Sequence, residues 1–199
     1  MTMDPRLTES ELEDEIRSHI SVAYGAMDLV PVVASVGAAI CAAFEHGHRL
    51  YAFGNGGSAA EAQHLVAEFV GRFARERRAL PAVSLTTDPS VVTCISNDFD
   101  FDRLFARQVT ALVTPGDIVV GFTTSGTSAN VVAGLAAARA AGATTVLIGA
   151  GDGADAAAHA DHRLLVQASD TARVQEMHLL LLHLLSETVD RWAEATDGR

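Results

Sequence analysis

The sequence contains only two cysteines, Cys41 and Cys94, among its 199 residues. They stand far apart, so their spacing excludes a paired cysteine metal site and a redox motif of the usual kind. Reduced thiols in a cytosolic setting are the simplest interpretation of such sparse cysteine usage. We therefore expect a cytoplasmic protein.

Positively charged residues are also scarce. The chain has 14 Lys and Arg against 25 Asp and Glu, which gives a formal net charge of −11. A broad nucleic-acid-binding surface needs clustered basic residues, so this composition excludes one. It does not exclude a phosphorylated metabolite, because backbone amides and hydroxyl groups can hold one phosphate without a basic patch.

No hydrophobic run is long enough to span a bilayer comfortably. The longest uncharged run, residues 29–44, is interrupted by Pro31. The first residues, Met-Thr-Met-Asp-Pro, are polar and acidic, unlike a signal peptide. With 49% hydrophobic residues the chain can still bury one substantial core, so we expect one domain over residues 1–199 and no membrane partner.

Apolar segments alternate with helical patterns after two N-terminal helices, which are expected between residue 8 and about residue 47. The predicted strands cover residues 50–53, 82–85, 118–122, 145–148 and 163–166. The predicted helices cover residues 59–73, 90–96, 102–112, 130–141 and 171–195. This order predicts an α/β fold: a doubly wound, five-stranded parallel sheet in three layers, of flavodoxin type, with an N-terminal helical extension. Ligands of such folds bind beyond the carboxyl ends of the strands.

The segment Gly-Asn-Gly-Gly-Ser-Ala at residues 54–59 follows the first predicted strand and opens a helix. Glycines let the backbone turn sharply, and amides at a helix N-terminus bind anions such as phosphate. Ser58 and Glu61 match a capping box, which predicts where the helix begins. The segment also fits the G-x-G-x-x-A pattern of dinucleotide sites, with Asp88 at the place of a ribose-binding acid.

A second polar loop, Thr-Thr-Ser-Gly-Thr-Ser at residues 123–128, follows the third predicted strand and precedes a helix. Capping of that helix accounts for one hydroxyl group and leaves the others unexplained. Two anion-binding loops at the carboxyl ends of two parallel strands favour a phosphosugar over a dinucleotide.

His64 and Glu68 lie four residues apart and therefore share one face of a predicted helix, with Arg72 continuing the stripe. Taken alone, such a stripe is equally compatible with plain solvated surface, but its position after the anion-binding segment favours function. In the last helix, Gln175 and His183 are separated by about 12 Å of helical rise. They reach one point only if their side chains lean together or a subunit boundary passes through the site.

The last helix is almost continuously apolar from His178 to Leu185, so more than one of its faces must be buried. His178 is expected to be a core histidine rather than a ligand. The N-terminal helices, within residues 1–48, also carry more alanine and valine than one small sheet needs. Together these surfaces predict a homo-oligomer with a helical interface.

Five segments of the sequence occur in an order that is typical of one protein family. They are Gly54-Asn-Gly-Gly-Ser58, Ala62-Gln-His-Leu-Val-Ala-Glu68, Asn97-Asp98, Thr124-Ser-Gly126 with Ser128, and Asp170-Thr-Ala-Arg-Val-Gln175 with His183. This ordered set resembles the phosphoheptose isomerases (sedoheptulose 7-phosphate isomerases), a family of sugar isomerase (SIS) domain proteins, over essentially the whole chain. The resemblance implies a homotetramer with active sites between subunits. It also implies conversion of sedoheptulose 7-phosphate to an aldose, D-glycero-D-manno-heptose 7-phosphate.

The resemblance further implies roles for individual residues. It makes Glu68 and His183 the acid/base pair. It places one Zn²⁺ per subunit on His64, Glu68, Gln175 and His183. The implied substrate contacts are Asn55, Gly56, Gly57, Ser58, Glu68, Arg72, Asn97, Asp98, Thr123, Thr124, Ser125, Ser128, Asp170 and Gln175.

The chain departs from the usual family pattern in two places. Thr123 and Thr127 stand where the hydroxyl loop commonly has Ser and Asn, and Glu61, which the predicted cap explains, stands where Asp is common. Two alternatives stay open. A close relative of the same fold associates with the bacterial replication initiator and lacks counterparts of Glu68 and His183, both of which this chain retains. A sensor or an isomerase for another sugar phosphate is the second alternative.

Overall fold

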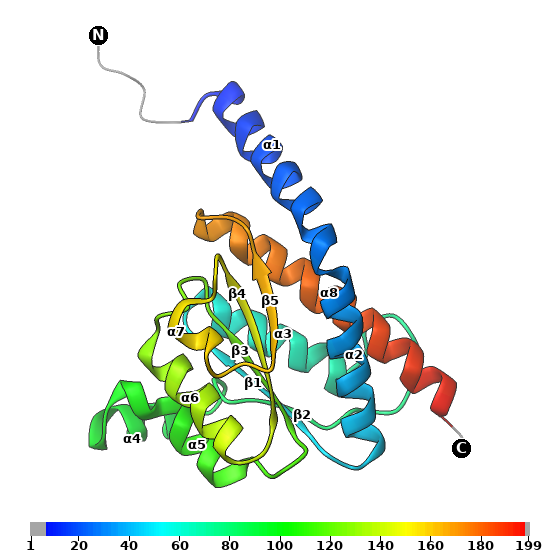
Figure 1. Cartoon of the computed structure of the whole chain (residues 1–199), viewed down its shortest axis with the longest axis vertical. Coiled ribbons are helices and arrows are strands. Elements are labelled where there is room, and N and C mark those ends of the chain that lie inside the picture. The colour runs from blue at the N-terminus through cyan, green and yellow to red at the C-terminus, as the bar shows by residue number, and fades with distance from the viewer. Residues whose placement is uncertain (1–6, 198–199) are drawn as a thin grey trace.

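The computed structural model describes residues 7–197 and contains one five-stranded sheet between layers of helices (Figure 1). The strands are β1 (Leu50–Gly54), β2 (Ala82–Ser84), β3 (Ile118–Phe122), β4 (Thr144–Ala150) and β5 (His162–Val166). All neighbouring strands are parallel, in the order β2-β1-β3-β4-β5. This is the flavodoxin-type order, so the predicted α/β three-layer class is confirmed.

The helices follow the predicted pattern closely. They are α1 (Glu9–Gly25), α2 (Val30–Glu45), α3 (Gly57–Val70), α4 (Pro89–Asp98), α5 (Leu104–Leu112), α6 (Ala129–Ala140), α7 (Ala154–Ala157) and α8 (Thr171–Thr196). Two short 3-10 turns, η1 (Ala26–Leu29) and η2 (Phe101–Arg103), join α1 to α2 and α4 to α5. The single turn α7 and both 3-10 turns were not predicted, because pieces this short carry no helical periodicity.

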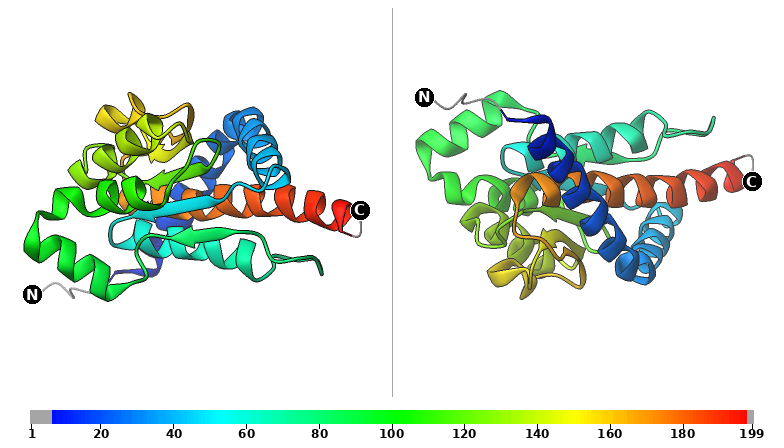
Figure 2. Two further views of the ribbon diagram at one scale, coloured as in Figure 1. Left: turned by 90° about the horizontal axis from the view of Figure 1, so that it is seen from below. Right: turned by 90° about the horizontal axis from the view of Figure 1, so that it is seen from above.

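Two hydrophobic clusters cover the two faces of the sheet. Because side chains alternate along a strand, Leu50 and Ala52 of β1 point into one cluster while Tyr51 and Phe53 point into the other. The first cluster is closed by α2, α3 and α8, and the second by α4, α5, α6 and α7. Figure 2 shows the sheet between these two helical layers.

The N-terminal helix α1 projects away from the body of the fold (Figure 1). It starts with a capping box: the Glu11 amide donates to Thr8 Oγ1, and the Thr8 amide donates to Glu11 Oε2 at 2.7 Å. The helical stretch Glu9–Glu45 is long and apolar enough to cross a membrane by length and composition. Its C-terminal half is nevertheless part of the core, since Val36 and Ile40 of α2 are fully buried.

The predicted capping box at the start of α3 is wrong. The N-cap is Gly56, and no side chain caps the helix. Ser58 and Glu61 point inward and are only 3% and 8% exposed. Glu61 Oε2 lies 3.1 Å from Nδ1 of His178, which is a core histidine as expected, and the His178 Nε2 group donates to the Gly149 carbonyl at 3.1 Å. Glu61 of α3 therefore contacts His178 of α8 and does not cap the N-terminus of α3.

Candidate active site at the carboxyl ends of the strands

The loop after β1 has the geometry of an anion-binding turn. At Gly54 a Cβ atom would lie 2.7 Å from the Ser58 carbonyl oxygen, so no side chain fits there. Gly56 has φ +57°, a left-handed conformation that glycine adopts without a steric cost. Within residues 7–197, the amide of Gly57 has no acceptor. Because it lies at the positive end of the α3 dipole, this turn suits a phosphate or sugar oxygen.

The loop after β3 divides its hydroxyl groups between two tasks. Thr123 is 4% exposed, and its Oγ1 accepts the Gly126 amide at 3.1 Å. Ser125 Oγ accepts the Thr127 amide at 3.2 Å. The hydroxyl groups of Thr124 and Ser128 have no partner within the described part of the chain and are therefore available to a ligand. Ser128 is the N-cap of α6 without a side-chain cap bond, so the expected capping hydroxyl is absent at that position.

A pair of amide side chains joins the two loops. Asn55 Nδ2 donates to Asn130 Oδ1 at 2.8 Å, and Asn130 Nδ2 donates to Asn55 Oδ1 at 2.9 Å. The pair spans β1 and β3, the point at which the strand order reverses and ligands of this fold class bind. Asn130 was missed by the sequence analysis, because an asparagine in the first turn of a helix carries no signal of its partner.

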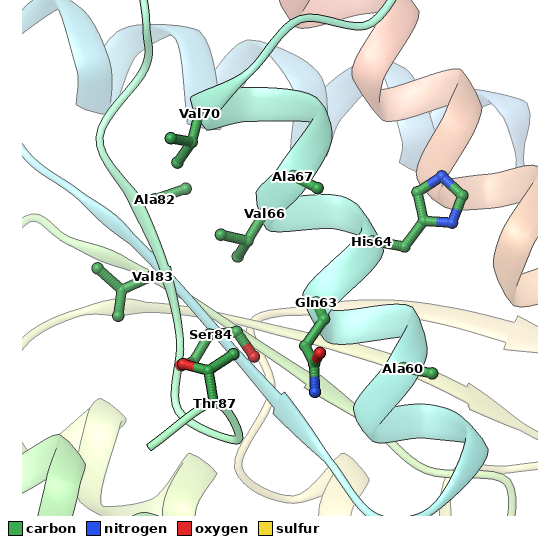
Figure 3. Close-up of a pocket in the computed structure, with 10 residues that line it drawn as sticks. All are labelled: Ala60, Gln63, His64, Val66, Ala67, Val70, Ala82, Val83, Ser84 and Thr87. Carbon is green, nitrogen blue, oxygen red and sulfur yellow. The ribbon is translucent and has the colours of Figure 1, made fainter.

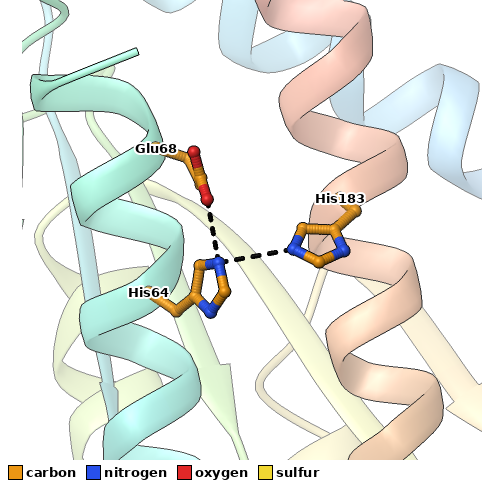
Figure 4. A group of neighbouring side chains, drawn as sticks. All are labelled: His64, Glu68 and His183. Atoms are coloured by element: carbon orange, nitrogen blue, oxygen red, sulfur yellow. Dashed lines mark hydrogen bonds and ion pairs between the residues drawn. The ribbon is translucent and has the colours of Figure 1, made fainter. Parts of the chain in front are cut away.

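The predicted acid/base residues meet between α3 and α8 (Figure 4). His64 Nε2 lies 2.8 Å from Glu68 Oε1 and 3.3 Å from His183 Nε2. One ligand atom from each of the three residues lies within 4.8 Å of the others. A carboxylate and an imidazole that are far apart in the sequence thus converge with a second imidazole.

The surroundings of His183 favour its neutral form. Burial lowers the pKa of His183 below its ordinary value, and the nearby His64 acts in the same direction, while Glu68 opposes them. The Phe73 ring packs against the His183 ring with 5.6 Å between centroids, which contributes to this burial. Near neutral pH the His183 ring therefore keeps one nitrogen free to accept a proton or to bind a metal.

Gln175 and His183 contact α3 at two different places. A Cβ atom at Gly57 would overlap the Gln175 amide, so Gln175 lies directly against the first residue of α3. His183 instead meets His64, about two turns further along. The spacing of Gln175 and His183 along α8 is therefore similar to the spacing of Gly57 and His64 along α3. Asp170 is the N-cap of α8 and accepts the amides of Ala172 and Arg173.

Other predicted contacts are not brought to this cluster. Arg72 pairs with Glu76 at 2.7 Å, and its side chain is 58% exposed. Asn97 donates to Asp98 at 2.7 Å, and both are exposed at the end of α4, which covers the opposite face of the sheet from α3 and α8. Asp88, the ribose-binding residue of the dinucleotide alternative, caps α4 by accepting the amides of two following residues. Helix capping fully accounts for that carboxylate.

An open cavity of about 630 Å³ runs along α3 beside the edge strand β2. Its lining is mostly apolar, and Val70 and Val83 are 47% and 41% exposed there. His64 stands at its border, and Figure 3 shows this side chain projecting toward α8. An apolar surface therefore adjoins the acid/base cluster.

Comparison with known proteins identifies the family of this chain. Residues 28–150 match the family model of the SIS domain. The chain is 46% identical over 179 residues to a phosphoheptose isomerase of Roseiflexus sp., covering 89% of this chain and 91% of that relative. It is 44% identical over 182 residues to one of Geobacter sp., covering 91% and 95%. The solved phosphoheptose isomerase of Neisseria gonorrhoeae has a TM-score of 0.87 at 36% identity, covering 92% of this chain and 98% of that one. The chain therefore belongs to the SIS domain family and, within it, to the phosphoheptose isomerases.

Proposed function

We propose that Glu68 and His183 perform the acid/base chemistry of an aldose–ketose isomerase that converts sedoheptulose 7-phosphate to D-glycero-D-manno-heptose 7-phosphate. The observation that carries this proposal is the convergence of both residues with His64 between α8 and α3, the helix that begins at the anion-binding turn after β1. It favours catalysis over the initiator-binding alternative, since a binding module has no need of an acid/base pair in a ligand site.

In this proposal each of the two loops binds a different part of the substrate. The hydroxyl loop, with Thr124, Ser125 and Ser128 at the N-terminus of α6, holds the phosphate through hydroxyl and amide donors. The turn at Asn55, Gly56 and Gly57 begins the helix that carries Glu68, so it holds the end of the sugar nearer to the reacting carbons. Gln175, which lies against Gly57, adds an amide to that part of the site. Thr123 positions the hydroxyl loop from within, and Ser58 anchors the first turn of α3.

The reaction moves one proton between two neighbouring carbons. One residue of the pair removes a proton from C1 of the ketose, which gives an enediol, and a proton is then returned to C2. The other residue of the pair transfers protons at the oxygens, because the O1 hydroxyl must lose its proton while the C2 carbonyl oxygen gains a proton. Positioned acid/base groups of this kind typically contribute about 10²–10⁴-fold to the rate.

The same three side chains fit Zn²⁺. Two ligands about 2.1 Å from a tetrahedral ion lie about 3.4 Å apart, and the facing nitrogens of His64 and His183 are separated by 3.3 Å. Two imidazoles and one carboxylate are also a common zinc donor set. His64, Glu68 and His183 would hold the ion, and Gln175 was predicted as a further ligand. A bound Zn²⁺ would polarise the substrate carbonyl and stabilise negative charge on its oxygen.

The remaining predicted contacts support a site shared between subunits. Asn97 and Asp98 lie across the sheet from the acid/base cluster, so in this proposal they contact the substrate in the site of a neighbouring chain. Arg72 and Asp170 do the same at the rim of that site.

Helix α1 leaves several apolar side chains exposed in a single chain. They are Leu12, Ile16, Ile20 and Tyr24. We propose that the N-terminal segment, residues 1–48, forms the interface of a homotetramer; residues 1–6 of this segment lie outside the described residues. We also propose that the protein is cytoplasmic, where the free thiols Cys41 and Cys94 stay reduced.

One incubation tests the proposal. Purified protein is mixed with sedoheptulose 7-phosphate, and the sugar phosphates are followed by NMR. We expect an aldoheptose 7-phosphate from the wild type, and no turnover from Glu68→Gln or His183→Asn, both of which should remain folded. His159→Gln, a change at a partly exposed histidine after α7, is the matched control and should keep full activity. Full activity in either site variant would remove that residue from the mechanism.

A further inference from the structure

The segment that follows α3 carries an unusual concentration of charge. Four of the 14 basic residues of the chain are Arg72, Arg75, Arg77 and Arg78. Arg77 is the buried one, with its side chain 1% exposed, and its Nε lies 3.0 Å from Oδ1 of Asp190, which is also 1% exposed. Two opposite charges removed from water in this way cost free energy unless their geometry is well satisfied.

The remaining donors of Arg77 satisfy the end of α3. Its Nη1 group donates to the carbonyl oxygens of Phe69 and Gly71 at 2.8 and 3.0 Å. Its Nη2 group donates to the carbonyl oxygen of Glu68, the proposed acid/base residue. The last carbonyls of a helix have no partner within the helix, so this guanidinium replaces the missing donors. Arg77 therefore holds the backbone of Glu68 directly.

Asp190 completes the connection from the side of α8. Its Oδ2 accepts the amides of Ala74 and Arg75 at 3.1 and 2.7 Å. Burial alone would raise the pKa of Asp190, but these two amides and Arg77 outweigh it and lower the pKa, so the carboxylate is charged. Asp190 lies seven residues after His183, and positions seven apart share one helix face. The face of α8 that presents His183 to α3 thus also binds the end of α3.

We propose that Arg77 and Asp190 are positioning residues that fix Glu68 of α3 against His183 of α8. The pair joins the backbone of one proposed acid/base residue to the helix that carries the other, through two buried side chains. A displacement of about 1 Å in a reacting group can cost about 10²-fold in rate. Without this connection the end of α3 shifts relative to α8, while the turn after β1 and the hydroxyl loop after β3 keep their positions. This inference rests on the proposed function.

The test compares two buried carboxylates of the same kind. Asp117 is 2% exposed and accepts the amides of Arg49 and Thr114, both at 2.8 Å, at the opposite end of the sheet. Asp190→Asn and Asp117→Asn each remove one such charge without changing shape. We expect Asp190→Asn to lower kcat about 10- to 100-fold, with KM for sedoheptulose 7-phosphate within about twofold of wild type. Asp117→Asn is expected to keep kcat, although it also loses stability.

A second variant, Arg77→Lys, and a crystal structure of Asp190→Asn complete the test. Arg77→Lys keeps the charge but loses the forked geometry, so it should lower kcat less than Asp190→Asn and stands in for it if that variant does not fold. A kcat equal to that of Asp117→Asn, or a change confined to KM, would overturn the inference. If the wild type itself fails to isomerise the sugar, the proposed function is wrong. A crystal structure of Asp190→Asn then tests the positioning role alone, because an unchanged 3.3 Å separation of His64 and His183 contradicts it.

Discussion

Asn55 and Asn130 exchange two side-chain hydrogen bonds, at 2.8 and 2.9 Å, across the gap between the loops that follow β1 and β3. Asn130 is 2% exposed, so the pair is buried on the side of α6, while Asn55 is partly exposed. The turn after β1, which we propose binds the sugar, and the loop after β3, which we propose binds the phosphate, are therefore held as one unit. A substrate that spans both loops is bound by groups already at a fixed separation.

The first prediction concerns that link. Asn130→Ala leaves the Asn55 amide without its partner, which should cost about 1–3 kcal/mol of stability. We expect KM for the sugar phosphate to rise about tenfold with a smaller change in kcat, because a loosened loop must be ordered again on binding. Steady-state kinetics measures both constants. Gln108→Ala, which removes an amide bonded to Leu85 and Leu104, is the control, and an equal KM in the two variants would contradict the prediction.

A second prediction uses the close approach of Gln175 to Gly57. In Gly57→Ala the new methyl group would overlap the Gln175 amide, which is the end of a flexible side chain. We expect the fold to survive, Gln175 to be displaced, and activity to fall about tenfold or more through loss of a positioned amide. Gly25→Ala has open space around it and should raise stability by about 0.5–1 kcal/mol without affecting turnover. Wild-type activity in Gly57→Ala would remove Gln175 from the site.

The fold could be predicted from the sequence because buried parallel strands appear as continuous apolar runs. Residues 118–122 form a continuous apolar run, and every residue of β3 is buried. The alternation of such runs with helical periodicity then determines the layer order. Element ends were less predictable. Ser58 and Glu61 match a capping box by type and spacing, yet both face the interior, and tertiary contacts overrode the local signal.

The site was predictable only where one segment carries its own chemistry. His64 and Glu68 share a helix face by spacing alone, and their pairing with His183 followed from family resemblance rather than from any local pattern. Contacts between distant segments left no trace in the sequence. Glu61 and His178 are 117 positions apart, and Arg77 and Asp190 are 113 apart. The run of arginines after α3 indicates charges that need acidic partners, but it does not identify Asp190 as one of those partners.

The third prediction tests the metal. Zn²⁺ at 100 times its dissociation constant should stabilise the folded protein by about 2.7 kcal/mol, which corresponds to a rise in Tm of about 5–10 °C for a chain of this size. Thermal unfolding with added Zn²⁺ and with a chelator measures the shift. His64→Ala removes one of the three converging ligands and should abolish it. His159→Ala, at a partly exposed site after α7, should retain it, and equal shifts in both variants would place the ion elsewhere.

The fourth prediction concerns acid stability and Asp190. The folded-state pKa of Asp190 is lowered, because two backbone amides and Arg77 outweigh the effect of burial. A carboxylate whose pKa is depressed on folding stabilises the protein fully above its unfolded pKa of about 3.9, and this contribution is lost as pH falls through the folded value. Asp190→Asn leaves the buried Arg77 charge unpaired, so we expect it to cost about 3 kcal/mol at neutral pH. Its unfolding free energy should also fall less steeply than that of the wild type below about pH 4. Urea unfolding of both proteins between about pH 3 and pH 7 checks this, and parallel curves over the acidic range would show that Asp190 does not carry the pH dependence.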